Sequence, residues 1–129
     1  MLTSRSLEEL EGSIQSSVFQ SHLAVKCQRL YKLPLCDLSV ENLRMLVGQK
    51  LGLKYTVPLA LDMLEQNPMV SGGMYEGDLL VNVAKLNANF WSSNPELNNR
   101  LVEIKIQLET LAETINNELL PIIASMDFK

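Results

Sequence analysis

Apolar residues recur along most of this chain at intervals of three and four, the spacing that places them on one face of an α-helix. Five segments carry such a stripe: Leu23, Cys27, Leu30 and Tyr31; Val40, Leu43, Leu46, Val47 and Leu51; Val57, Ala60, Leu61 and Leu64; Leu79, Leu80, Val83 and Leu86; and Leu97, Leu101, Ile104, Leu108, Leu111 and Ile115. The pattern predicts an all-α fold, a compact single-domain bundle of about six to eight helices spanning residues 1–129.

Residues that can begin a helix precede most of these stripes. Ser, Thr, Asn and Asp side chains accept hydrogen bonds from the free N–H groups of a first turn. The candidates are Ser6, with Glu9 completing a capping box, Ser21, Ser39, Thr56, Asp78 and Asn94. Pro58 and Pro95 would then lie in first turns, where no amide donor is needed. Pro34 and Pro68 end helices, and residues 13–20 are expected to be mostly loop.

Glycines mark two further points in the centre of the chain. Gly52 is placed to close the helix over residues 40–51 in a left-handed conformation. Gly48 lies inside that helix, either as a tolerated cost or because another helix crosses closely there. Residues 69–77 contain three glycines and no periodicity, which predicts a surface loop of the kind that often carries function. Phe90 and Trp91 follow in a short helical turn, with Trp91 either in the core or exposed to a partner.

The last stripe, from Leu97 to Ile115, alternates steps of four and three, which is a heptad seam. The next step, to Leu119, is four instead of three, and Pro121 is expected to kink the long C-terminal helix. Such a seam could join two copies as a coiled coil. Because Val102 and Ile106 widen the apolar face, we expect it to pack on the earlier helices and the free protein to be a monomer.

The formal charge of −4 at pH 7 is unevenly divided. Residues 26–54 carry six basic side chains against two acids, and residues 55–98 carry five acids against Lys85. An acidic surface suits a basic partner protein and disfavours nucleic acid, although it could also be an ordinary solvated face. No apolar stretch approaches the ~20 residues that span a bilayer, so we expect a cytoplasmic protein.

Residues suited to catalysis or metal binding are few. His22 is the one histidine, and Cys27 and Cys36 are the two cysteines, so no metal site and no cofactor are predicted. A hydrolase using His22, Cys27 and Asp37 has no local support, and we predict no catalytic residues and no enzyme. A helix-turn-helix over residues 39–66 would place Asp62 and Glu65 on the groove-binding helix, which carries the wrong charge for DNA.

Two strings carry a family resemblance: LRMLVGQKLGLKYTVPLALDMLEQNP at residues 43–68 and YEGDLL at residues 75–80, led in by LPLCDLSVENLR from Leu33. They resemble the signature of bacterial contact-dependent growth inhibition (CDI) immunity proteins. The resemblance covers roughly residues 23–91. Most of its residues already have structural explanations, so it indicates a fold and does not mark an active site.

The resemblance implies a small helical protein that binds and blocks the cognate toxin domain, the C-terminal domain of a CDI toxin delivered by a neighbouring cell. Such toxins are commonly nucleases, here one that cuts RNA, and carboxylates can occupy a basic substrate cleft. The expected toxin-binding residues are Asp62, Glu65, Tyr75, Glu76 and Asp78. Asp78 could instead be only a helix cap and Tyr75 only core. The alternative function is a helical regulatory or adaptor domain that binds DNA or dimerises through the C-terminal seam.

Overall fold

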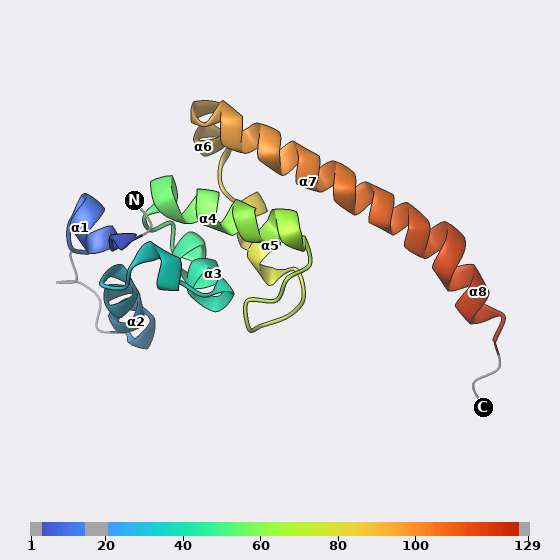
Figure 1. The fold of residues 1–129 in the computed structure, drawn as a ribbon, viewed down its shortest axis with the longest axis horizontal. Helices are drawn as coiled ribbons and strands as arrows, with labels where there is room; N and C mark the ends of the chain where they lie inside the picture. The colour runs from blue at the N-terminus through green and yellow to red at the C-terminus, as the bar shows by residue number, and fades with distance from the viewer. Residues whose placement is uncertain (1–3, 15–20, 127–129) are drawn as a thin grey trace.

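The computed structural model describes residues 4–14 and 21–126, and all of its regular elements are helical (Figure 1). In chain order these are α1 (Leu7–Glu11), α2 (His22–Tyr31), the 3-10 turn η2 (Leu35–Asp37), α3 (Val40–Gly48), α4 (Leu53–Gln66), α5 (Asp78–Ala84), α6 (Ala88–Ser93), α7 (Pro95–Thr114), the π-helical segment η3 (Ile115–Leu119) and α8 (Leu120–Ala124). The prediction of an all-α fold with a long C-terminal helix is confirmed. Residues 15–20 of the predicted loop lie outside the described residues.

Three of the six predicted helix caps are confirmed, and a fourth, Asp78, is instead the first residue of α5, whose N-cap is Gly77. Ser6, Ser21 and Ser39 each accept a hydrogen bond from the backbone N–H three residues on. At Ser6 the carboxylate of Glu9 accepts from the serine hydroxyl, at 3.4 Å. The start at Asn94 is different, because its side chain makes no cap and donates instead to the carbonyl of Phe90 at 2.8 Å. Pro95 therefore begins α7 without the predicted side-chain cap.

The turn between α3 and α4 differs from the prediction. Lys50, with φ 59°, is the left-handed residue that closes α3. Its N–H donates to Val47 and the next N–H, of Leu51, donates to Leu46, which is the Schellman pattern. Gly52, at φ 60°, is instead the N-cap of α4. The chain thus uses two left-handed residues where one was expected.

An earlier start for α4 changes the roles of Thr56 and Pro58. Thr56 is buried inside the helix, and its hydroxyl donates to the carbonyl of Leu51 at 3.2 Å, so it is not the N-cap. Pro58 lies within the helix, past its first turn. The prediction of Thr56 as the N-cap was wrong because the left-handed Gly52 begins the helix without a capping side chain. Polar N-cap residues alone do not indicate such a start.

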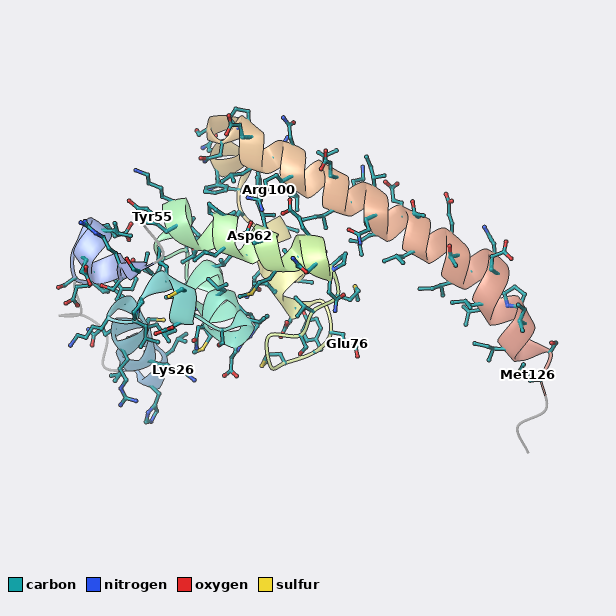
Figure 2. The ribbon with its side chains drawn as sticks, in the orientation of Figure 1. Lys26, Tyr55, Asp62, Glu76, Arg100 and Met126 are labelled. Atoms are coloured by element: carbon teal, nitrogen blue, oxygen red, sulfur yellow. The ribbon has the colours of Figure 1, made fainter. Side chains whose placement is uncertain are left out.

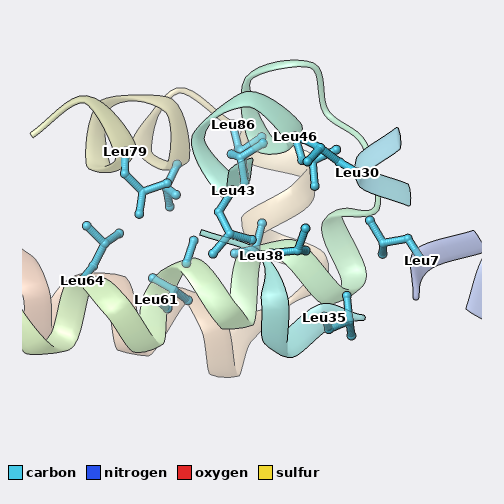
Figure 3. Packing of buried hydrophobic residues seen from close by; sticks show 14 of the residues in the cluster. Leu7, Leu30, Leu35, Leu38, Leu43, Leu46, Leu61, Leu64, Leu79 and Leu86 are labelled. Carbon is cyan, nitrogen blue, oxygen red and sulfur yellow. The ribbon is translucent and has the colours of Figure 1, made fainter. Parts of the chain in front are cut away.

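The hydrophobic core lies where α3, α4 and α5 meet (Figure 3). Leu43, Leu46, Leu61, Leu64 and Leu79 are all fully buried there. Of the two explanations left open for Gly48, the structure supports the close approach of another helix: a Cβ on Gly48 would lie 2.9 Å from Nδ2 of Asn82 on α5. That amide donates to the carbonyl of Arg44 at 2.9 Å. A larger residue at position 48 would displace the Asn82 amide and disturb its hydrogen bond to Arg44.

The C-terminal helix packs on this body only through its first turns. Leu97 and Leu101 are partly buried and Ile104 is buried, on the side that faces α4. From residue 109 to residue 126 every residue is exposed, and α7 and α8 extend away from the other helices (Figure 1). The expectation that the seam packs on the earlier helices is right for its first half and wrong for Leu111 and Ile115, which are 42% and 44% exposed.

Candidate functional site

The loop of residues 69–77, between α4 and α5, has an ordered structure held from within. Ser71 and Glu76 form an antiparallel bridge across the loop. The N–H of Gly77 donates to the carbonyl of Met69 at 3.0 Å and closes its base. Gly77 itself has φ 92°, a left-handed conformation that favours glycine, and it leads directly into α5.

Asp78, the first residue of α5, organises this loop. Its side chain is 3% exposed. Oδ1 accepts from the N–H of Gly72 at 2.5 Å, and Oδ2 accepts from those of Met74 at 2.9 Å and Tyr75 at 3.3 Å. Burial alone would raise the pKa of this carboxyl, but these backbone donors outweigh it and hold the pKa below its usual value. Asp78 is therefore a charged structural centre.

Arg44 on α3 joins the loop to the core. Its Nε donates to the carbonyl of Gly72 at 2.8 Å and lies 3.6 Å from Oδ2 of Asp78. The backbone passes so close that a Cβ at position 72 would lie 2.9 Å from Cβ of Arg44. At Gly73, with φ 105°, a Cβ would lie 3.2 Å from the carboxylate of Glu41. Because neither glycine has a side chain, the loop backbone can pack directly against α3.

The loop tip points its side chains outward. Met74 is 70% exposed, Tyr75 is 55% exposed and Glu76 is exposed. Glu76 lies at the edge of the body (Figure 2). The backbone that holds Met74 and Tyr75 is fixed by Asp78, so the tip displays an apolar, an aromatic and an acidic side chain in a defined arrangement.

The other two predicted site residues lie on α4 and are bound by Arg100 of α7. Nη2 of Arg100 lies 2.6 Å from Oδ1 of Asp62 and 2.7 Å from Oε1 of Glu65, and Nε donates to Glu65 at 2.9 Å (Figure 2). The hydrogen bond from Arg100 lowers the pKa of Glu65, and in return the pKa of Arg100 is raised. Asp62, Glu65 and Arg100 together carry one net negative charge. The Asp62 side chain remains 65% exposed.

The five predicted residues therefore form two groups with different structural roles. Asp62 and Glu65 tie α4 to α7, and Asp78 holds the loop that displays Tyr75 and Glu76. Tyr75 is not core, whereas Asp78 is buried. Three further residues of these groups, Arg44, Arg100 and Met74, were not predicted. Arg100 lies beside the heptad seam. A basic residue at such a flanking position often pairs with an acid on another helix, and this position could have indicated its role.

Residues of the kinds that an enzyme or a metal centre would use have ordinary surroundings. Burial raises the pKa of the Cys27 thiol, which makes it a poor nucleophile. Tyr31 donates to the carboxylate of Glu11 at 2.6 Å, linking α2 to α1. In residues 4–14 and 21–126, His, Cys, Asp and Glu nowhere gather in a group of three that could hold a metal ion. Within the same ranges, every helix is too short or too polar to cross a bilayer.

The described residues form a helical body with one internally hydrogen-bonded loop whose tip side chains are exposed. The family model for CDI immunity proteins matches residues 8–101, which includes the body, the loop and the start of α7. The chain belongs to the CDI immunity protein family, and an immunity role follows from that membership. No curated protein and no solved structure matches the chain.

Proposed function

We propose that this protein neutralises its cognate CDI toxin domain by binding it one to one through the loop tip, Met74, Tyr75 and Glu76, with Asp62 contributing from α4. The observation that carries this proposal is the internal support of the loop. Asp78 and Arg44 fix the backbone from the buried side, while the tip side chains face solvent. A loop already ordered before binding loses little conformational entropy when a partner arrives.

The chemistry of the tip suits a protein partner. Tyrosine and methionine are enriched at protein interfaces because they bury large areas, and tyrosine keeps a polar end for a hydrogen bond. Tyr75 and Met74 are adjacent and are the most exposed large hydrophobic residues of this loop. They would supply the buried centre of the contact, and Glu76 beside them would supply charge.

The acidic side chains suit a toxin whose substrate cleft is basic. An enzyme that cuts RNA needs such a cleft to bind phosphates. Carboxylates of an inhibitor can take the place of phosphates and speed the encounter through long-range attraction. Arg100 already neutralises one of the two charges at Asp62 and Glu65. The electrostatic part of the contact therefore rests more on Glu76 than on Glu65.

The test is co-expression with the cognate toxin domain, together with a binding measurement on the purified pair. Tyr75→Ala is expected to raise the Kd by at least tenfold, the loss typical of a central interface residue. Glu76→Lys is expected to slow association and to make its rate less sensitive to salt. Glu103→Lys, the same charge reversal on an exposed position of α7, is the matched control.

Protection that saturates at equimolar toxin and immunity protein supports inhibition by binding. The proposed surface is wrong if Tyr75→Ala and Glu76→Lys protect cells as well as Glu103→Lys does. The function itself is wrong if the wild-type chain neither binds the cognate toxin nor delays cell death when the toxin is induced.

A further inference from the structure

The free half of the C-terminal helix carries an apolar stripe that the body does not cover. Seven aliphatic side chains between residues 111 and 126 are 42% to 56% exposed: Leu111, Ile115, Leu119, Leu120, Ile122, Ile123 and Met126. A helix without tertiary packing is marginal in water, because most helical stability in proteins comes from burying an apolar face. The match to the family model ends at residue 101, so it does not include this half of the helix.

The π-helical segment keeps this stripe in line. The sequence takes a step of four from Ile115 to Leu119 where the heptad requires three, so a regular α-helix would turn the later residues off the seam. A π-helical turn accommodates one extra residue, and the structure places it at Ile115–Leu119. With that residue absorbed, Leu119, Ile123 and Met126 follow Leu111 and Ile115 on one face. Pro121 lacks an N–H and cannot donate the regular backbone hydrogen bond of an α-helix. This explains the irregular hydrogen bonding of the turn before it.

The polar pattern of the free half identifies what can cover it. Ala112 and Thr114 flank the stripe, and the carboxylate of Glu118 lies one turn after Thr114, next to Leu119. At 100° per residue, Glu109 and Glu113 lie on the opposite side of the helix. A basic toxin cleft would be met by carboxylates, which the stripe lacks. An identical aliphatic stripe complements it, with the exposed Glu118 carboxylates of the two copies at the edge of the contact.

The area available is enough for a stable pair. Seven side chains of this size, each about half exposed, offer on the order of 600 Å² per chain, so two copies could bury up to roughly 1,200 Å², the lower end of the range for specific interfaces. We infer that two copies of this chain dimerise by pairing the free halves of their α7–α8 helices through the stripe from Leu111 to Met126. This replaces the expectation of a monomer.

The body restricts how the two helices can run. The first half of the same stripe, around Leu101 and Ile104, faces α4. In a parallel pair, both bodies would occupy the space between the two helices at the same end. An antiparallel pair avoids this clash, because each body then lies beyond the C-terminal end of the other chain's helix. The pairing uses no residue of the toxin-binding loop.

Sedimentation of the full chain tests the dimer. We expect twice the 14.5 kDa mass of one chain, and we expect Ile115→Lys to sediment at the mass of one chain and to lose helical content only from the unpaired half, with the unfolding transition of the body unchanged. Glu113→Lys, on the opposite side of the same turn, is the matched control and should remain dimeric. A wild-type chain that stays monomeric at every attainable concentration overturns the proposal. If Ile115→Lys instead weakens binding of the toxin to that monomer, the stripe belongs to the toxin interface.

Crosslinking tests the direction of the helices in a Cys36→Ser background, which removes the exposed native thiol. In the antiparallel pair, position 119 lies near the middle and meets its own copy, whereas position 111 lies opposite position 126. Leu119→Cys should therefore form a disulfide-linked dimer on mild oxidation, and Leu111→Cys alone should not. Efficient crosslinking of Leu111→Cys to its own copy would overturn the antiparallel arrangement.

Discussion

Replacing Asp78 by Asn tests whether one buried carboxylate organises the loop. The amide has the same shape, but it can accept on one oxygen only, while the carboxylate accepts three backbone N–H groups on two. If the remaining oxygen keeps the short bond to Gly72, the new NH₂ group faces the N–H groups of Met74 and Tyr75. Arg44 also loses its ion pair, at 3.6 Å.

The expected loss of stability is large for a change of one atom. Each hydrogen bond to a charged group contributes about 1.5–3 kcal/mol, and the bond to Tyr75 is long, so we expect Asp78→Asn to lower the free energy of unfolding by about 3 kcal/mol. The matched control is Glu76→Gln, the same chemical change two residues earlier on an exposed side chain. It should change the free energy by less than about 0.5 kcal/mol.

Urea denaturation followed by far-UV circular dichroism measures this difference, and amide hydrogen exchange locates it. The N–H groups of Gly72 and Met74 should exchange faster in Asp78→Asn, and the Kd for toxin should rise because the tip is no longer held. Equal denaturation midpoints for Asp78→Asn and Glu76→Gln, with unchanged exchange at those amides, would refute the role assigned to Asp78.

The pH dependence gives a second measure of the same group. The pKa of Asp78 is lower in the folded state than its ordinary value of 3.8. Its contribution is therefore complete above the unfolded pKa and is lost as the pH falls from there through the folded pKa. Asp78→Asn should show a smaller loss of stability below about pH 4 than the wild type.

Three further changes test the helix contacts. Arg100→Met should cost about 1 kcal/mol, since the ion pairs are partly exposed, and the loss should shrink as salt rises, whereas Lys105→Met should have no salt-dependent effect. Lys50→Gly should raise the free energy of unfolding by about 1 kcal/mol by relieving a left-handed lysine, measured by urea denaturation. Gly48→Ala should destabilise through the contact with Asn82, and calorimetry should show that Gly48→Ala costs less in an Asn82→Ala background.

Local patterns predicted the helices well because their signals are short-range. The apolar spacing of three and four and the serine caps act within a single turn, and Ser21 and Ser39 cap helices as predicted. The errors around Thr56 have a physical reason. A left-handed residue at Lys50 or Gly52 is selected by how α3 and α4 pack, and glycine or lysine alone does not say which helix end it serves.

The candidate site could be predicted only in part, because its supporting contacts join distant parts of the chain. Arg100 lies 35 residues after Glu65 and 38 after Asp62. No periodic pattern links residues so far apart. The negative charge predicted for residues 55–98 therefore did not take account of Arg100, which pairs with two of the acids. The exposed tip was predicted from its glycines, whereas its support by Arg44, 28 residues before Gly72, became visible only in the folded chain.

The way Asp78 holds the loop has a consequence for how specificity can diverge. It binds Met74 and Tyr75 only through their backbone N–H groups, which every amino acid except proline possesses. The side chains at positions 74 and 75 can therefore be exchanged freely without weakening the support beneath them. Under the proposed binding mode, a new toxin partner requires changes at these two residues and Glu76, while the helical body stays as it is.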